Sequence, residues 1–327
     1  MSAIDEVLRE PVFAAAPPVL VDVGASGGVH AAWKELAKYS ICIAFDPDER
    51  EMAGTRRASR GYKDFHVFNR ALTAGAEGLS DFYLTKSPPC SSLLAPNAEK
   101  LAAWEFADRF RVLKKSAVET IRLATALAAS RVERVDWFKT DSQGTDLRLF
   151  LSLGSSLIRR VLVAEFEPGI MDAYEGEDKL WKLMQCMDEE GFWMSEMTIK
   201  GSTRMRKDAA RGLRGFERNY MVHVLKNSPG WGEVTYLNAF AGDGFGKRDY
   251  LLGWVCATLQ RQHGFALELA ETGRRKFRDA VFEELRRNTI YAIRRSYFHL
   301  PSYLPLVGRA IRKWEKLRLA KRAAAQT

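Results

Sequence analysis

The chain has 327 residues, 46% of them hydrophobic, which is enough for a large core and leaves room for an extension. Its 50 Lys and Arg exceed its 41 Asp and Glu, so the formal net charge is +9. The excess lies from Gly232 onward, where 18 basic residues meet 9 acidic ones, whereas residues 1–231 carry 32 of each sign. We therefore expect a neutral main domain and a basic C-terminal part.

Cysteine spacing and the distribution of charge argue against several classes of protein. The four cysteines form no Cys-x-x-Cys pair, which argues against structural zinc and fits a reducing cytosol. Charged side chains among the first ten residues argue against an apolar signal peptide. The longest uncharged stretch of the C-terminal third has 13 residues, fewer than the ~20 that a spanning helix needs. We expect a cytoplasmic protein.

The first strong pattern is a β-branched run that enters a glycine-rich turn at Val19-Leu-Val-Asp-Val-Gly-Ala-Ser-Gly-Gly28. An amphipathic helix through Trp33 and Leu36 should follow, and a second strand should end at Asp46, 22 residues after Gly24. This strand–turn–helix–strand order is typical of sites that hold a nucleoside cofactor, with the acidic residue on the ribose. The glycine spacing departs from the dinucleotide pattern, and Asp-x-Gly is more typical of S-adenosylmethionine sites.

The next elements are less regular. The pattern predicts a helix over residues 49–59, a strand over 64–73, and a hairpin turn at 75–78 with its second strand over 79–84. Residues 85–97 form a loop rich in prolines and hydroxyls, which either caps a domain or lines a site. We take Ser91 and Ser92 of this loop as candidate substrate ligands. A helix is predicted near residues 118–129.

Strands and helices then alternate to residue 225. The pattern predicts a strand at 135–141 ending in Asp141, a strand at 160–165 ending in Glu165, a helix at 180–187, and two last strands at 192–199 and 217–225. The resulting fold class is α/β, with a doubly wound, mostly parallel seven-stranded sheet of Rossmann-like type and a helical C-terminal extension. The expected domains are an N-terminal segment (1–18), a cofactor-binding domain (19–228) and a basic extension (229–327).

Several blocks of this sequence together resemble the FkbM family of class I S-adenosylmethionine-dependent methyltransferases. They cover about residues 19–225: Asp22-Val-Gly-Ala-Ser-Gly-Gly28, Phe45-Asp-Pro47, Pro89-Cys-Ser-Ser-Leu-Leu-Ala-Pro-Asn97, Asp136-Trp-Phe-Lys-Thr-Asp-Ser-Gln-Gly144 and Glu165-Phe-Glu167. The sequence departs from the family pattern at Gly144-Thr145-Asp146 and at Pro168-Gly169. The resemblance implies methyl transfer to an oxygen of a sugar, a glycan or a glycan-derived natural product. It also implies a set of cofactor-binding residues: Asp22, Gly24, Ala25, Gly27, Gly28, Asp46 and Asp141.

An alcohol needs a base or a metal to become a nucleophile. We expect Asp141 to be the base and Glu165 to be the alternative, although each acid could instead cap a helix or hold a loop. Asp141, Asp146 and Glu165 are also oxygen ligands of the kind that suits Mg²⁺. No spacing demands a metal, and we do not favour one.

A basic loop over residues 200–215 offers a site for the acceptor. Arg204 and Arg206 belong to it, and arginine pairs well with phosphate oxygens. A nucleotide-sugar pyrophosphate, a lipid-linked phosphate or an acidic polysaccharide would supply such an anionic group. The alternative is a solvated loop.

The basic C-terminal helix predicted at 306–322 leaves three interpretations open: a solvated face, contact with a second subunit in a homodimer, or peripheral contact with an anionic membrane surface. Two other functions also stay open. One is binding or modification of nucleic acid, against which the sequence offers no recognised RNA-binding module, so we expect no sequence-specific nucleic-acid partner. The other is an inactive methyltransferase-like subunit.

Overall fold

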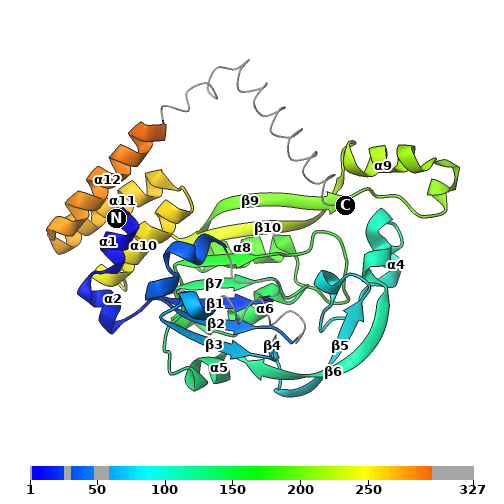
Figure 1. Ribbon diagram of the computed structural model, residues 1–327, viewed down its shortest axis with the longest axis horizontal. Coiled ribbons are helices and arrows are strands. Elements are labelled where there is room, and N and C mark those ends of the chain that lie inside the picture. Colours follow the sequence, from blue (N-terminus) through cyan, green and yellow to red (C-terminus); the bar gives the residue numbers. More distant parts are fainter. Residues whose placement is uncertain (1, 26–30, 48–58, 297–327) are drawn as a thin grey trace.

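The computed structural model describes residues 2–25, 31–47 and 59–296. Its centre is a seven-stranded sheet of order β3-β2-β1-β7-β8-β10-β9 (Figure 1). Every adjacent pair is parallel except those made by β10, which is antiparallel to both β8 and β9. The predicted mostly parallel seven-stranded α/β sheet is confirmed. The strands are β1 (Val19–Val23), β2 (Ile41–Phe45), β3 (Asp64–Phe68), β7 (Trp137–Thr140), β8 (Val163–Phe166), β9 (Phe192–Ser202) and β10 (Ser228–Asn238).

One face of the sheet is covered by short helices, and its core is aromatic. Phe138 and Phe166 project from β7 and β8 and meet Phe150 of a covering helix, with ring centroids 5.3–6.4 Å apart. Such edge-on contacts add to the free energy gained by burying the rings. The helices on this face are α5 (Leu123–Ala129), α6 (Asp146–Leu151), α7 (Ser155–Ile158) and α8 (Leu180–Glu189). The predicted helix at 180–187 is therefore confirmed.

The opposite face is covered by both ends of the described chain. Side chains of α1 pack with those of the C-terminal helices over Leu20, Trp137 and Val163 of the sheet. In Figure 1 these helices gather at one end of the sheet. The elements of this layer are α1 (Ala3–Leu8), α2 (Pro11–Ala15), the 3₁₀ turns η1 (Ala31–Glu35) and η2 (Ala37–Tyr39), α10 (Lys247–Leu259), α11 (His263–Phe277) and α12 (Ala280–Ser296).

A buried ion pair fixes this layer to the sheet. The guanidinium of Arg248 at the start of α10 contacts both carboxylate oxygens of Asp136, at 2.8 and 2.7 Å. It also donates to the carbonyls of Ala16 and Pro17, and Asp136 accepts the N–H of Val19. The N-terminal segment and the described C-terminal helices thus form one layer.

A second, three-stranded sheet of order β4-β6-β5 lies at the end of the molecule away from that helical layer (Figure 1). Three predictions are wrong here. Residues 64–73 form two strands in different sheets, the strands on either side of 75–78 do not pair with each other, and the first residues of the helix predicted near 118–129 belong to strand β6, with only Leu123–Ala129 helical. The elements here are η3 (Ser59–Gly61), β4 (Ala71–Thr73), β5 (Gly78–Thr85), η4 (Pro88–Cys90), α4 (Ala98–Leu101), η5 (Glu105–Phe110) and β6 (Val112–Arg122).

The predicted last strand at 217–225 is also wrong, because this segment is helix α9 (Gly215–His223), preceded by η6 (Ala209–Gly212). Glu217 accepts the backbone N–H of Arg214 at 2.8 Å, which stabilises the first turn of α9. The last strand is instead β10, so the sheet continues to Asn238, beyond the predicted boundary at 228. The predicted helix at 49–59 lies almost wholly outside the described residues. No helix in the described ranges is long and apolar enough to cross a bilayer.

Candidate functional site

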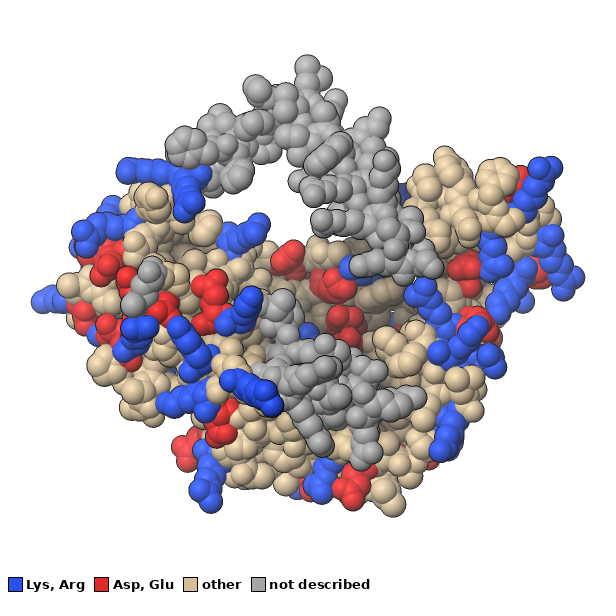
Figure 2. All heavy atoms as spheres, viewed as in Figure 1, with Lys and Arg blue, Asp and Glu red and all other residues tan. Residues whose placement is uncertain are grey.

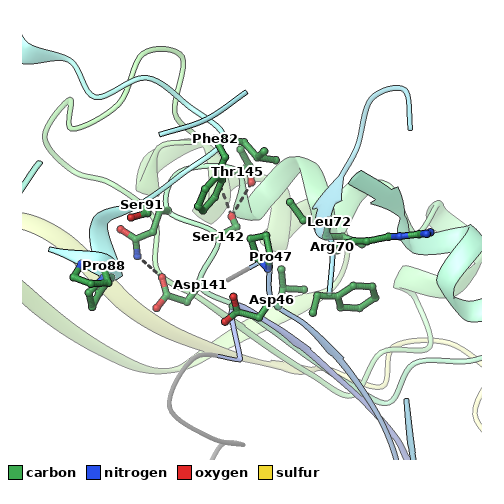
Figure 3. Close-up of a pocket in the computed structure, with 17 residues that line it drawn as sticks. Asp46, Pro47, Arg70, Leu72, Phe82, Pro88, Ser91, Asp141, Ser142 and Thr145 are labelled. Atoms are coloured by element: carbon green, nitrogen blue, oxygen red, sulfur yellow. Dashed lines mark hydrogen bonds between the residues drawn. The ribbon is translucent and has the colours of Figure 1, made fainter. Parts of the chain in front are cut away.

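The candidate site is a cavity of about 150 Å³ at the carboxyl ends of β1, β2 and β7, where the main sheet meets the second sheet (Figure 3). Gly24, Asp46 and Asp141 line it from the main sheet, and Leu72 and Phe82 line it from the second. The volume is below the roughly 300–1,000 Å³ typical of small-molecule sites, so a nucleoside would fill the cavity and extend from its mouth. The position is that expected for a ligand of a doubly wound sheet.

Gly24 is required by the close approach of two strand ends. Its φ is +78°, and a Cβ there would lie within 3.0 Å of the carbonyl oxygen of Asp141, closer than real Cβ atoms come. The Asp141 N–H donates to Val23 O at 2.9 Å, and the amides of Gly24 and Ala25 both donate to Phe45 O, at 3.0 and 3.2 Å. These bonds tie together the ends of the three strands that form the site.

Ala25 is 1% exposed, so it contributes packing rather than a polar group. The other predicted glycines of the turn, Gly27 and Gly28, lie outside the described residues.

Asp22, on β1 two residues before Gly24, carries an unusual carboxylate, although it does not itself line the cavity. It is fully buried, and its Oδ1 lies 3.0 Å from the ammonium nitrogen of Lys139 on the neighbouring strand. Burial alone would lower the pKa of Lys139, but the Asp22 carboxylate raises it above its ordinary value, so the ammonium keeps its proton. The second oxygen, Oδ2, has no hydrogen-bond partner. A buried carboxylate oxygen without a donor is costly, which suits a ligand that brings one.

Asp46 follows β2 and lines the same cavity from the opposite side of the Gly24 turn. Its backbone N–H donates to Phe68 O at 3.2 Å, and the residue is 5% exposed. Figure 3 shows the carboxylates of Asp46 and Asp141 drawn into one pocket. Two of the predicted site residues, 95 positions apart in the sequence, are thereby brought together.

The carboxylate of Asp141 is oriented by a chain of two further side chains. Gln143, two residues on, donates from Nε2 to Asp141 Oδ1, and the phenol oxygen of Tyr174 lies 2.9 Å from Gln143 Oε1. Burial raises the pKa of Tyr174, so the phenol stays protonated and can donate. The same phenol oxygen also lies 2.9 Å from Cys90 O, so its one proton can be donated to either oxygen while the Gln143 amide donates to Asp141.

The pKa of Asp141 is raised to about 6, first by burial and then by the nearby Asp146 carboxylate. Lys139 and the hydrogen bond from Gln143 act in the opposite direction. A carboxylate with this pKa is ionised at neutral pH and accepts a proton more readily than an ordinary aspartate.

Asp146 has a structural role in the loop after β7. Its Oδ1 accepts from the Thr140 hydroxyl at 3.1 Å and from the N–H of Ser142 at 2.9 Å, and its Oδ2 accepts the N–H of Glu167 at 2.8 Å. Because both oxygens are engaged, this carboxylate holds the ends of β7 and β8 in place. Nowhere in the described ranges do three or more His, Cys, Asp or Glu form a group able to hold a metal ion, so Asp141, Asp146 and Glu165 are not assembled as a magnesium site.

Glu165 lies on a different surface from Asp141. It accepts a hydrogen bond from the indole N–H of Trp137 at 2.6 Å and lines a separate groove of about 360 Å³ with Glu167, Glu196 and Glu233. Burial and then the Asp141 carboxylate raise the pKa of Glu167 to about 8. Glu167 thus lines the groove, but its pKa depends on Asp141 of the cavity. The sequence offered no signal for this residue beyond its place in the Glu165-Phe-Glu167 block.

The two candidate serines have different positions. Ser91 lines the cavity and accepts the Thr85 N–H at 3.1 Å. Ser92 is 1% exposed, and its hydroxyl donates to Gln143 O at 2.7 Å and accepts the Leu94 N–H at 3.0 Å. The Ser92 hydroxyl is therefore buried and holds the Gln143 loop, whereas only Ser91 of the two lines the cavity.

The basic loop is outside the cavity. Arg204 is exposed, and Arg206 lines a groove of about 680 Å³ between this loop, α4 and η5 that shares no residue with the cavity. A further groove of about 710 Å³ does share Pro88 with the cavity, and its charged lining residues are Lys86, Arg109, Lys207 and Arg218 together with Glu105 and Asp108. Cationic side chains thus begin at the mouth of the cavity, although Arg204 and Arg206 themselves lie further out.

Comparison with known proteins assigns no family. No protein-family model matches the chain, and no curated protein matches it.

Proposed function

We propose that this protein is an S-adenosylmethionine-dependent methyltransferase that methylates a hydroxyl oxygen of a sugar, a glycan or a glycan-derived natural product. The observation that carries the proposal is the cavity at the carboxyl ends of β1, β2 and β7, which Gly24, Asp46 and Asp141 line together. The ribose hydroxyls of the cofactor would donate to Asp46, and the methionine part would lie against the Gly24 turn.

A nicotinamide dinucleotide fits the same turn less well. In dinucleotide sites the backbone N–H groups of the turn bind a pyrophosphate. Here the N–H groups of Gly24 and Ala25 are already donated to Phe45 O. The edge of the sheet is also an antiparallel β9–β10 pair rather than a sixth parallel strand.

When bound, the cofactor supplies an electrophilic methyl group on a sulfonium. Asp141 is the residue suited to receive the proton of the acceptor hydroxyl as the new C–O bond forms, because its raised pKa makes it a base near neutral pH. Gln143 and Tyr174 hold its carboxylate in one orientation. Phe82 and Leu72 exclude water from the cavity wall, which protects the donor from hydrolysis.

The acceptor would reach Asp141 past Ser91 and Pro88, where the cationic groove begins. A phosphate or carboxylate on the acceptor would bind there to Lys86 or Arg109. We thus expect the anionic group of the acceptor to bind residues at the mouth of the cavity as well as the basic loop.

Calorimetric titration with S-adenosylhomocysteine, the demethylated product, tests the donor site without any knowledge of the acceptor. We expect the wild type to bind, Asp46→Ala to bind at least about tenfold more weakly, and Asp64→Ala, at an exposed position, to bind as the wild type. Absence of heat with the wild type would refute the proposal.

Asp141→Asn then separates binding from chemistry. The variant should bind the product normally but lose methyl transfer to any acceptor on which the wild type is active. An inactive methyltransferase-like subunit would instead show binding with no turnover in the wild type, whichever acceptor is offered.

A further inference from the structure

Helix α9 presents its apolar residues to solvent rather than to the core. Phe216, Tyr220 and Val224 follow one another at intervals of four residues and are 69%, 54% and 63% exposed. No residue of the helix is buried. In Figure 1 the helix projects from the edge of the molecule. We call these three side chains the α9 face.

The side of α9 that faces the protein carries Glu217 and Arg218 together with the half-buried Met221 and Val222. Arg218 donates to Glu105 of η5 at 2.6 Å, and the Glu105 N–H donates to Thr203 O at 3.0 Å just before the basic loop. The helix is therefore held on the body by its charged side, which leaves the apolar α9 face outward. Contiguous exposed apolar side chains of this kind mark an interaction surface.

The surroundings of the α9 face are strongly cationic. Residues 200–226 contain eight Lys and Arg against two Asp and Glu, a net charge of 8 − 2 = +6. Figure 2 shows Lys and Arg gathered at the end of the molecule where α9 projects. Of these cations, four make no ion pair with another described residue: Arg204, Arg211, Arg214 and Lys226.

We propose that the α9 face and the basic residues around it form a docking surface for an anionic lipid membrane. Phe216, Tyr220 and Val224 would enter the interface between headgroups and acyl chains, while the arginines contact lipid phosphates. This inference does not require the proposed methyl transfer. It differs from the membrane contact expected of the C-terminal helix at 306–322, which lies outside the described residues.

Charge and shape favour lipid over two other occupants. A second copy of the chain would bring two surfaces of charge +6 together, which is repulsive. Single-stranded nucleic acid binds in grooves with stacked aromatic side chains. The α9 face instead projects, and its neighbours Leu213 and Leu225, 39% and 51% exposed, are aliphatic.

Vesicle co-sedimentation of the full chain tests the proposal. We expect binding to phosphatidylcholine vesicles that contain phosphatidylglycerol, little binding to phosphatidylcholine alone, and weaker binding as salt is raised. The variant Phe216→Ser/Tyr220→Ser/Val224→Ser should lose about tenfold or more of the partition coefficient. Its thermal midpoint should stay unchanged, because these side chains are exposed.

Two matched variants locate the surface. Leu79→Ser/Leu113→Ser/Trp181→Ser removes apolar side chains that are 76%, 59% and 67% exposed elsewhere, and should bind as the wild type. Neutralising the C-terminal segment, with Gln at Arg309, Arg312, Lys313 and Lys316 in the full chain, should leave the requirement for the α9 face intact.

Three results would overturn the proposal: no binding of the wild type to anionic vesicles, binding that survives in the α9 variant, or an equal loss in the Leu79/Leu113/Trp181 variant. Sedimentation velocity on the same proteins identifies self-association if the wild type dimerises and the α9 variant does not. Fluorescence anisotropy with a single-stranded oligonucleotide identifies nucleic-acid binding. Either behaviour without vesicle binding also contradicts a lipid surface.

Discussion

Replacing Gly24 by alanine should break the site at the point where β1 meets the end of β7. The new Cβ would lie within 3.0 Å of the Asp141 carbonyl oxygen, so the two segments must separate. The bonds that hold them, from Asp141 N–H to Val23 O at 2.9 Å and from Gly24 N–H to Phe45 O at 3.0 Å, would lengthen as they do so.

The expected loss of unfolding free energy can be worked out by comparison with Gly191, which lies just after helix α8. Its φ of +81° nearly equals the +78° of Gly24, but a Cβ there meets nothing within 4 Å. Gly191→Ala should therefore lower the free energy of unfolding only by the cost of the left-handed backbone, about 1–2 kcal/mol. Gly24→Ala carries that cost and also weakens at least one buried hydrogen bond, worth about 1–3 kcal/mol. We expect a loss of about 2–5 kcal/mol.

Urea unfolding followed by circular dichroism measures both losses, and titration with S-adenosylhomocysteine measures the site. Gly24→Ala should be the less stable variant by about 1–3 kcal/mol and should bind the product much more weakly, whereas Gly191→Ala should bind normally. Equal stability of the two variants would show that the contact with Asp141 does not constrain the backbone. Unimpaired product binding by Gly24→Ala would show that the turn is not part of the site.

Three further predictions concern the acids of the site and the core. With an acceptor in hand, kcat/KM should fall below about pH 6 as Asp141 is protonated. The hydrogen bond from Gln143 lowers the pKa of Asp141, so Gln143→Ala should raise that pKa and move the acidic limb of the profile to higher pH. An unmoved limb would exclude Asp141 as the base. Arg248→Leu should lower the free energy of unfolding, measured in urea titrations, by about 3–5 kcal/mol, because it leaves the Asp136 charge buried without its partner. Adding Asp136→Leu should restore part of this loss. Additive losses from the two substitutions would contradict the ion pair. A thermal-shift assay with S-adenosylhomocysteine should raise the midpoint of the wild type but not that of Asp46→Ala, and equal shifts would remove Asp46 from the donor site.

The parallel core of the sheet was predictable because its strands carry local signals. Apart from the paired Asp22 and Lys139, the buried runs that end at Val23, Phe45 and Thr140 are mostly apolar on both faces, as expected of strands covered on both sides. Asp46 and Asp141 directly follow two of these strands, so the sequence also predicted correctly that they lie at the carboxyl edge of the sheet.

The last strand was missed because Ser228-Pro-Gly230 resembles a linker. In the structure this part of β10 pairs only with β9, and a bulge between Pro229 and Trp231 accommodates the missing N–H of the proline. The segment before it was mistaken for a strand because Phe216 to Leu225 is mostly apolar. Its four-residue spacing, from Phe216 to Tyr220 to Val224, was the available sign of a helix.

The sequence by itself determined the order of the central strands along the chain and the side chains that reach their carboxyl ends, because both depend on patterns within a few residues. Only the tertiary structure distinguished the roles of the acids. Asp141 lines the cavity, Asp146 is saturated by Thr140, Ser142 and Glu167 at the ends of β7 and β8, and Glu165 lies on another groove. These differences arise from contacts between segments far apart in the chain. Such contacts determine the burial, hydrogen bonds and pKa of each acid, and they cannot be predicted from the neighbouring residues in the sequence.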